Sequence, residues 1–258
     1  MSKSNAPNTI VLTGASSGIG AALVAAYAAP GVRMLLIARD AGRLATVAAG
    51  ATKAGAEVET FVRDVTDAEA LRDAILGFDD RRAVELVIAN AGIALGGLPE
   101  PEGQAKRVAE VNYFGMLNTV EPLIPRMIAR GAGRIALVSS ISAIRPSGDL
   151  PSYSASKAAV RAYGQAIRSK LRGEGVSVTV ICPGFVTSPM ADRHHGPKPF
   201  EITAEKAAAI IRKGVASRRG ALTFPWQFAL MVFLGNRLPP VLSDWFERRY
   251  AADIGGKS

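Results

Sequence analysis

Residues Thr13–Gly20 read Thr-Gly-Ala-Ser-Ser-Gly-Ile-Gly and follow directly on the apolar run Thr9–Thr13. A glycine-rich turn between an N-terminal strand and a helix lets the backbone approach a pyrophosphate closely. The free N–H groups at the start of the helix then bind its negative charge. The spacing is Gly-x-x-x-Gly-x-Gly instead of the more common Gly-x-Gly-x-x-Gly. The stretch therefore predicts a strand–turn–helix unit that binds a dinucleotide.

Apolar, β-branched runs alternate with alanine-rich helical patterns along most of the chain. Continuous apolar runs are typical of strands that are buried on both faces. Repeated strand–helix–strand units imply a parallel sheet with right-handed crossovers and helices on both sides. No linker or internal repeat interrupts them, so we predict a single α/β domain over residues 1–258, a Rossmann-like doubly wound parallel β-sheet, with a variable substrate-lid and C-terminal segment at 192–258. The expected strands are Thr9–Thr13, Arg33–Ala38, Glu57–Arg63, Leu86–Asn90, Arg134–Ser139 and Val176–Cys182, and the expected helices are Gly18–Ala28, Ala41–Ala54, Asp67–Leu76, Gln104–Arg130 and Ser152–Glu174.

The net charge of +9 is concentrated toward the end of the chain, where residues 193–258 hold 11 Lys and Arg against 5 Asp and Glu. Such an excess attracts anionic substrates or a phosphorylated cofactor, lies against anionic lipid, or simply maintains solubility. No basic patch interleaved with aromatic residues indicates a nucleic-acid partner. The single Cys182 excludes a disulfide framework within the chain and fits a reducing compartment. With no signal-peptide pattern at the N-terminus, we expect a cytoplasmic protein, with association with a membrane as the alternative.

A phenol and an ammonium lie four residues apart in Tyr153-Ser154-Ala155-Ser156-Lys157. On a helix they project from the same face. A fixed positive charge beside the phenol favours the phenolate and lowers the pKa of the tyrosine, which makes it a usable proton donor and acceptor near neutral pH. The hydroxyl of Ser140, thirteen residues upstream, could hold a carbonyl oxygen at the same place. Taken alone, the Tyr-x-x-x-Lys pair is equally compatible with a solvated helix face.

Five motifs occur in a fixed order along residues 8–190. In order and spacing they resemble the motifs of the short-chain dehydrogenase/reductase family. The resemblance implies an oxidoreductase that transfers a hydride between a nicotinamide cofactor and a ketone or secondary alcohol. The motifs are Thr13–Gly20, Asp64-Val65 after the third strand, Asn90-Ala91-Gly92 at the end of the fourth, Ser140 with Tyr153-x-x-x-Lys157, and Pro183-Gly184-Phe185-Val186-Thr187 after the sixth.

The resemblance assigns roles to the residues at the reaction end. Tyr153 would donate a proton to the carbonyl oxygen, or take one from the alcohol in the reverse direction. Lys157 would lower the pKa of that phenol and hydrogen-bond the nicotinamide ribose, and Ser140 would orient the carbonyl oxygen. Asn112 matches the asparagine that holds a water between Lys157 and solvent. Ser139 competes with Ser140 for the serine role, but its spacing to Tyr153 fits less well.

The resemblance also implies a set of cofactor contacts. In the family, the residue matching Asp64 hydrogen-bonds the adenine amino group, and Thr187 would hold the nicotinamide carboxamide. Ala91 and Gly92 would let the cofactor ribose lie close to the backbone. The expected cofactor-binding residues are Gly14, Ser16, Ser17, Gly18, Ile19, Gly20, Arg39, Asp64, Val65, Asn90, Ala91, Gly92, Tyr153, Lys157, Pro183, Gly184, Val186 and Thr187.

The end of the second strand indicates which cofactor is preferred. Enzymes that use unphosphorylated NAD usually place an acidic residue there to bind the ribose 2′-hydroxyl. Ala38 occupies that place here, and the next residue, Arg39, can pair with a 2′-phosphate. The competing interpretation makes Asp40 the acidic partner and leaves Arg39 solvated. Many NADP-using relatives have a second basic residue in the glycine-rich turn, where this chain has Ser17. We predict a preference for NADP(H) over NAD(H).

The segment after the last motif departs from the usual family pattern. The apolar stretch Gln227–Gly235 is too short for a confident membrane span, which needs ~20 residues. It is compatible with a strand and helix packed over the substrate pocket or a dimer partner. The alternative to this preferred interpretation is an interfacial anchor that buries Trp226, Phe228 and Phe233 in lipid. His194 and His195 are expected in a solvated loop, and no metal site is expected.

Three functions fit these residues. The first is a reductase or dehydrogenase of a small-molecule carbonyl or alcohol, and a hydrophobic substrate is compatible with it. We expect this enzyme to be a homodimer. The second is a membrane-surface reductase of a lipid-like substrate. The third is a catalytically silent regulator that binds NADP, although the intact catalytic set argues against it. The sequence leaves the substrate open.

Overall fold

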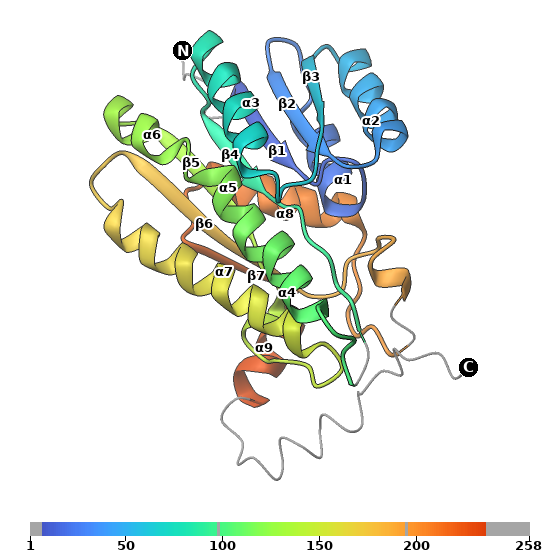
Figure 1. Ribbon diagram of the computed structural model, residues 1–258. Helices are drawn as coiled ribbons and strands as arrows, with labels where there is room; N and C mark the ends of the chain where they lie inside the picture. Colours follow the sequence, from blue (N-terminus) through green and yellow to red (C-terminus); the bar gives the residue numbers. More distant parts are fainter. Residues whose placement is uncertain (1–6, 97–98, 194–195, 236–258) are drawn as a thin grey trace.

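The computed structural model describes residues 7–96, 99–193 and 196–235, and its centre is a sheet of seven parallel strands (Figure 1). The strand order is β3-β2-β1-β4-β5-β6-β7, so the chain builds outward from β1 to β3, then crosses back to β4 and continues to the other edge. This is the doubly wound, Rossmann-like α/β architecture that the sequence predicts. The strands are β1 Thr9–Thr13, β2 Arg33–Ala38, β3 Glu57–Val62, β4 Leu86–Ala89, β5 Gly133–Val138, β6 Val176–Pro183 and β7 Ala221–Phe224.

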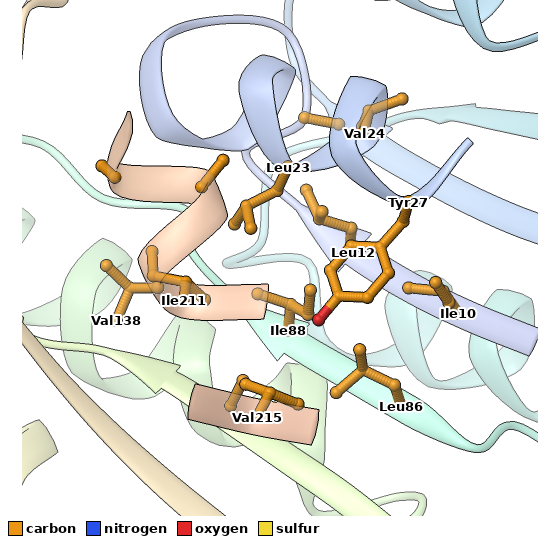
Figure 2. Packing of buried hydrophobic residues seen from close by; sticks show 14 of the residues in the cluster. Ile10, Leu12, Leu23, Val24, Tyr27, Leu86, Ile88, Val138, Ile211 and Val215 are labelled. Carbon is orange, nitrogen blue, oxygen red and sulfur yellow. The ribbon is translucent and has the colours of Figure 1, made fainter. Parts of the chain in front are cut away.

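Helices cover both faces of the sheet, and alternate residues of each central strand pack against opposite layers. Ile10 and Leu12 of β1 point into the cluster shown in Figure 2, where α1 and α8 pack over the sheet. Val11 of the same strand points into the opposite cluster, which α3, α5 and α7 help to build. The helices are α1 Gly18–Tyr27, α2 Ala41–Lys53, α3 Ala68–Arg81, α4 Gln104–Ala109, α5 Gly115–Val120, α6 Ile124–Arg130, α7 Pro151–Lys170, α8 Ala204–Ala216 and α9 Trp226–Gly235, with a π-helical turn η1 Glu110–Phe114 and short 3₁₀ turns η2 Ile141–Ala143 and η3 Ala191–Arg193.

Two elements differ from the simplest form of the sequence pattern. The helix expected over Gln104–Arg130, with a kink or a new turn expected at Pro122 and Pro125, is divided into α4, η1, α5 and α6. Pro122 lies in the turn before α6, and Pro125 occupies its first turn, where a missing N–H costs nothing. The strand β3 is not buried on both faces, because it forms the edge of the sheet and leaves Glu57 and Val62 exposed.

The C-terminal segment contains β7, which pairs in parallel with β6, followed by α9. This is the strand and helix that one interpretation of the sequence favoured. Within residues 7–96, 99–193 and 196–235, no helix combines the length and the apolar character that crossing a bilayer requires. His194, His195 and the segment 236–258 lie outside the described residues.

Gly20 tests how tightly the glycine-rich turn is packed. A Cβ at Gly20 would lie 2.0 Å from the carbonyl oxygen of Gly14, which is a backbone atom that cannot move aside cheaply. Gly20→Ala should therefore lower the free energy of unfolding by about 1–3 kcal/mol in urea denaturation. Gly50→Ala, in the exposed interior of α2 with nothing within 4 Å, should raise it by about 0.4–1 kcal/mol. Equal effects of the two substitutions would contradict this packing.

Candidate active site

A large cleft of about 1270 Å³ lies at the carboxyl ends of the strands. Its lining comes from both halves of the sheet, from Ala38 at the end of β2 to Pro183 at the end of β6. This is the topological switch point between β1 and β4, from which the connections run toward opposite edges of the sheet, and where ligands bind in open α/β sheets. The volume is large enough for a dinucleotide together with a small substrate, since pockets for single drug-sized ligands measure about 300–1,000 Å³.

The turn after β1 forms one wall of the cleft. Gly14 and Gly18 both have positive φ, at 69° and 52°, a conformation that glycine adopts without strain. A Cβ at Gly14 would lie 2.8 Å from the Cα of Ala91, so the turn and the end of β4 touch backbone to backbone. The side-chain Nδ2 of Asn90 donates to the carbonyl oxygens of Thr13 and Gly14, at 3.2 and 3.1 Å. Asn90 thus ties the turn to the neighbouring strand.

The first turn of α1 opens into this cleft. Ser17 is the N-cap residue, and its side chain makes no capping hydrogen bond to the helix. Ser16, Ser17, Gly18 and Ile19 all line the cleft. The positive end of the helix and its uncapped N–H groups suit an anion. The turn has no Cβ where it is tightest, and the start of the helix faces the cavity. Both features fit the pyrophosphate of a dinucleotide.

Asp64 accepts hydrogen bonds from several donors at the end of the cleft beside β2 and β3. Its Oδ2 accepts from Nη2 of Arg107 at 2.6 Å and lies 3.5 Å from Nη1 of Arg39. Its Oδ1 accepts from the backbone N–H and the hydroxyl of Thr66, at 3.1 and 3.0 Å. Burial alone would raise the pKa of Asp64, but the bonds from Thr66 and Arg107 hold it below its usual value. The carboxylate therefore holds Arg39, whose side chain is 58% exposed, beside the cleft.

Asp40 is already engaged by its own helix. Its Oδ1 accepts from the backbone N–H of Arg43 at 2.9 Å, and its Oδ2 accepts from Nε of Arg43 at 2.6 Å. These bonds cap α2 and keep the pKa of Asp40 below its usual value. Arg43 and Arg63 line the same end of the cleft as Arg39, although the sequence analysis did not select them. Their positions in the sequence could have indicated them, since Arg63 follows β3 and Arg43 lies in the first turn of α2.

Lys157 and Tyr153 project from the first turns of α7 into the other end of the cleft. Lys157 is only 4% exposed, and its Nζ donates to the carbonyl oxygen of Val138 at 2.9 Å. The same nitrogen lies 5.8 Å from the centroid of the Tyr153 ring. Burial lowers the pKa of Lys157 to about 8. Burial also raises the pKa of the half-buried Tyr153, and a hydrogen bond with Ser140 acts in the opposite direction.

These pKa shifts differ from the simple expectation that the ammonium of Lys157 lowers the pKa of the Tyr153 phenol. In this structure burial has the largest effect on both groups, because each loses the water that would stabilise its charge. Tyr153 is therefore protonated at neutral pH, as a proton donor must be. Lys157 titrates close to the physiological range.

The two adjacent serines have different partners. Ser139 is buried, and its hydroxyl donates to the backbone carbonyl of Lys157 at 2.7 Å, which joins the end of β5 to α7. Ser140 accepts a hydrogen bond from the backbone N–H of Ser142 at 3.1 Å and hydrogen-bonds Tyr153. Ser140 therefore lies beside Tyr153 in the cleft, whereas the hydroxyl of Ser139 bonds the backbone and has a structural role.

Asn112 lies in the π-helical turn η1, behind the cleft wall. Its Oδ1 accepts from the backbone N–H of Ile93 at 2.7 Å, and its Nδ2 donates to the carbonyl oxygen of Ile93 and to Ser156, both at 2.9 Å. A Cβ at Gly92 would lie 3.1 Å from Oδ1 of Asn112 and 3.2 Å from Nζ of Lys157. The absence of a side chain at Gly92 thus lets Oδ1 of Asn112 and Nζ of Lys157 pack close to the same point of the backbone. π-Helical turns occur frequently at functional sites.

Most of the residues that the sequence selected line the cleft, and three do not. Gly20 and Asn112 lie behind its wall. Thr187 is exposed, donates to the carbonyl oxygen of Ile202 at 3.4 Å and faces a small hollow against α1. The selected residues in the lining are Gly14, Ser16, Ser17, Gly18, Ile19, Arg39, Asp64, Val65, Asn90, Ala91, Gly92, Ser140, Tyr153, Lys157, Pro183, Gly184 and Val186.

A Rossmann-like sheet with Ser, Tyr and Lys at one end of its switch-point cleft is the architecture of a nucleotide-dependent oxidoreductase. The family model described as short chain dehydrogenase matches residues 8–197, and the chain belongs to this family of oxidoreductases. An uncharacterized oxidoreductase of Myxococcus xanthus is 34% identical over 246 residues, which cover 93% of this chain and 96% of that protein.

Solved structures show the same fold. A short-chain dehydrogenase/reductase of Burkholderia phymatum in complex with NAD superposes with a TM-score of 0.82 at 24% identity, covering 90% of this chain and 93% of that one. A short-chain dehydrogenase of Sphingobium yanoikuyae in complex with NADPH has a TM-score of 0.77 at 24% identity, covering 90% and 96%. Proteins of this fold thus bind either form of the cofactor.

The buried ammonium of Lys157 predicts a particular pH dependence of stability. The folded protein releases this proton at about pH 8, whereas the unfolded chain holds it up to about pH 10.5. Between these values the unfolded state binds more protons, so stability relative to Lys157→Met should rise with pH, by at most roughly 1.4 kcal/mol per pH unit. Urea denaturation of both proteins from pH 7 to 10 measures this difference. A difference that stays constant over the whole range would show that Lys157 keeps an ordinary pKa.

Proposed function

We propose that this protein is an NADP(H)-dependent reductase or dehydrogenase that interconverts a ketone and a secondary alcohol. The observation that carries the proposal is the convergence of Ser140, Tyr153 and Lys157 on the wall of the cleft that the glycine-rich turn also lines. The turn and the start of α1 suit the pyrophosphate, so a bound nicotinamide would extend along the cleft toward Tyr153. Family membership supports the reaction class.

The bound cofactor would supply a hydride to the carbonyl carbon, which is the two-electron part of the reduction. Ser140 donates a hydrogen bond to the carbonyl oxygen and stabilises the charge that develops there. Tyr153 transfers its proton to that oxygen, so one hydride and one proton convert the ketone to the alcohol. Lys157 stabilises the phenolate that Tyr153 leaves behind. The match of Asn112 to the family asparagine implies that a water beside it would replace the proton. Oxidation of an alcohol reverses each step.

Three arginines support the preference for NADP(H). Arg39, Arg43 and Arg63 line the end of the cleft beside β2 and β3, where the adenosine would bind. Among the described residues, the carboxylates at that end already accept hydrogen bonds. Asp40 is bound by Arg43, and Asp64 by Arg107. A ribose 2′-phosphate carries the negative charge that such a cluster suits. A 2′-hydroxyl would gain much less from it.

One observation favours a second candidate, the same chemistry performed at a membrane surface. Trp226, Leu230 and Phe233 of α9 are 69%, 47% and 54% exposed. Helical spacing places the three side chains along one stripe. Such a stripe suits an interfacial contact with lipid or a homodimer partner. A catalytically silent regulator is less well supported, because it would need none of the catalytic residues.

Tyr153→Phe tests the proposed proton donor. The substitution removes the hydroxyl and keeps the ring, so NADPH binding should be retained while ketone reduction falls by about 10²–10⁴-fold. NADPH fluorescence measures the binding, and the loss of NADPH absorbance with a panel of ketones measures turnover. Substantial remaining turnover in this variant would overturn the proposed mechanism.

Arg39→Ala tests the cofactor preference. Loss of a charge-assisted bond to the 2′-phosphate should raise the KM for NADPH by about 10–100-fold and leave the KM for NADH nearly unchanged. Arg72→Ala, on the exposed side of α3, is the matched loss of one positive charge and should change neither constant. A wild-type enzyme that is equally efficient with NADH, or an Arg39→Ala variant that weakens both cofactors alike, would contradict the preference.

A further inference from the structure

Helix α9 begins at the catalytic end of the cleft. It follows β7 directly, and β7 is the strand next to β6 at that edge of the sheet (Figure 1). The backbone N–H of Gly184, just after β6, donates to the carbonyl oxygen of Phe224 at 2.7 Å. Because parallel strands end at the same edge, the start of α9 is fixed beside the loop that follows β6.

One face of α9 lines the cleft that contains Ser140 and Tyr153. Phe228, Met231 and Val232 contribute to this lining. Their spacing of three and four residues places them on one side of a helix. The stripe that contains Leu230 lies on another side and is exposed. The cleft-facing side of α9 is therefore entirely apolar.

The position of Phe228 is fixed by two contacts. Its ring stacks on Phe185 with centroids 5.9 Å apart and planes inclined by 7°. A Cβ at Gly184 would lie 2.6 Å from Cδ1 of Phe228, so the helix approaches the backbone as closely as a glycine allows. Phe228 thus belongs to a packed wall with a defined shape, in contrast to the exposed Leu230.

The two sides of the cleft differ in chemistry at this end. Ser140 and Tyr153 offer hydroxyl groups to a carbonyl oxygen, whereas the three side chains of α9 offer no strong donor or acceptor. A hydroxyl group placed against that wall would lose its water without gaining a hydrogen bond, which is unfavourable. An alkyl chain or hydrocarbon ring would gain from leaving water.

We propose that Phe228, Met231 and Val232 form the substrate-selecting wall of the active site, and that the substrate is a ketone or secondary alcohol with an apolar chain or ring beside its reacting carbon. This inference rests on the proposed function and narrows its substrate class. Polyhydroxylated ketones, which present hydroxyl groups on both sides of the carbonyl, are the class that this wall disfavours.

The test uses uncharged ketones, because Arg145 and Arg193 also line the cleft and would attract an acid. Kd values of 2-butanone, 2-hexanone, 2-octanone and 1,3-dihydroxyacetone are measured by saturation-transfer NMR on the full-length protein saturated with NADP⁺. No turnover occurs in this complex, since NADP⁺ has no hydride to give. Affinity should rise by about fourfold per methylene group, the fold-change that corresponds to ~0.8 kcal/mol, and dihydroxyacetone should bind most weakly.

Phe228→Ala should weaken the binding of 2-octanone by about tenfold, or ~1.4 kcal/mol, and leave the affinity for dihydroxyacetone unchanged. Leu230→Ala removes an apolar side chain from the exposed side of the same helix and should change the Kd of none of the four ketones. Phe228→Leu keeps an apolar filler and should recover most of the affinity.

Either of two other results would contradict the proposal that α9 forms an apolar, substrate-selecting wall. Affinity that does not depend on chain length excludes an apolar contact. An equal loss of all four ligands in Phe228→Ala indicates a purely structural role. The NMR result stands whether or not the enzyme reduces any ketone with NADPH, so failure of this inference and failure of the proposed function are distinguished.

Discussion

The ammonium of Lys157, buried against the carbonyl oxygen of Val138, is the interaction on which the catalytic end of the molecule depends. Burying a charge is costly unless a partner receives it, so β5 must end where the side chain of α7 can reach it. Close packing makes this possible, because a Cβ at Gly164 of α7 would lie 2.6 Å from Val180 of β6 and 2.8 Å from Leu137 of β5. With α7 in this position, Tyr153, one turn earlier, lines the cleft.

The sheet topology joins this end of the cleft to a second end, which arginines line. The turn after β1 and the start of α1 lie between the two, and Asn90 holds the turn against β4. Beyond them the arginines line the cleft beside β2 and β3, with Asp64 holding Arg39 in place. One continuous cavity therefore has arginines at one end, Ser140 and Tyr153 at the other, and an apolar wall on α9. The hydrocarbon-like wall and the polar catalytic groups face the same space.

The sequence predicted the parts of the fold and site that depend on local order. The strand–turn–helix at Gly14 and the helical spacing of Tyr153 and Lys157 are properties of short segments, and the structure places both in the cleft. The π-helical turn at Asn112 was not predicted, because a continuous helical pattern does not reveal one extra residue per turn. The pairing of Arg107 with Asp64 was also missed, since the two residues are far apart in sequence and meet only through packing. The cleft-facing side of α9 was one of two open alternatives, because an apolar helix looks the same whether it covers a pocket or a lipid surface.

The pH dependence of kcat/KM for ketone reduction with NADPH tests the central claim most directly. If Lys157 must carry its proton to support Tyr153, the wild-type value should be constant below about pH 8 and fall tenfold per pH unit above it. Lys157→Arg, which stays charged throughout, should show no such fall up to pH 10. A wild-type profile that remains flat through pH 10, or a fall near pH 8 that persists in Lys157→Arg, would contradict the account.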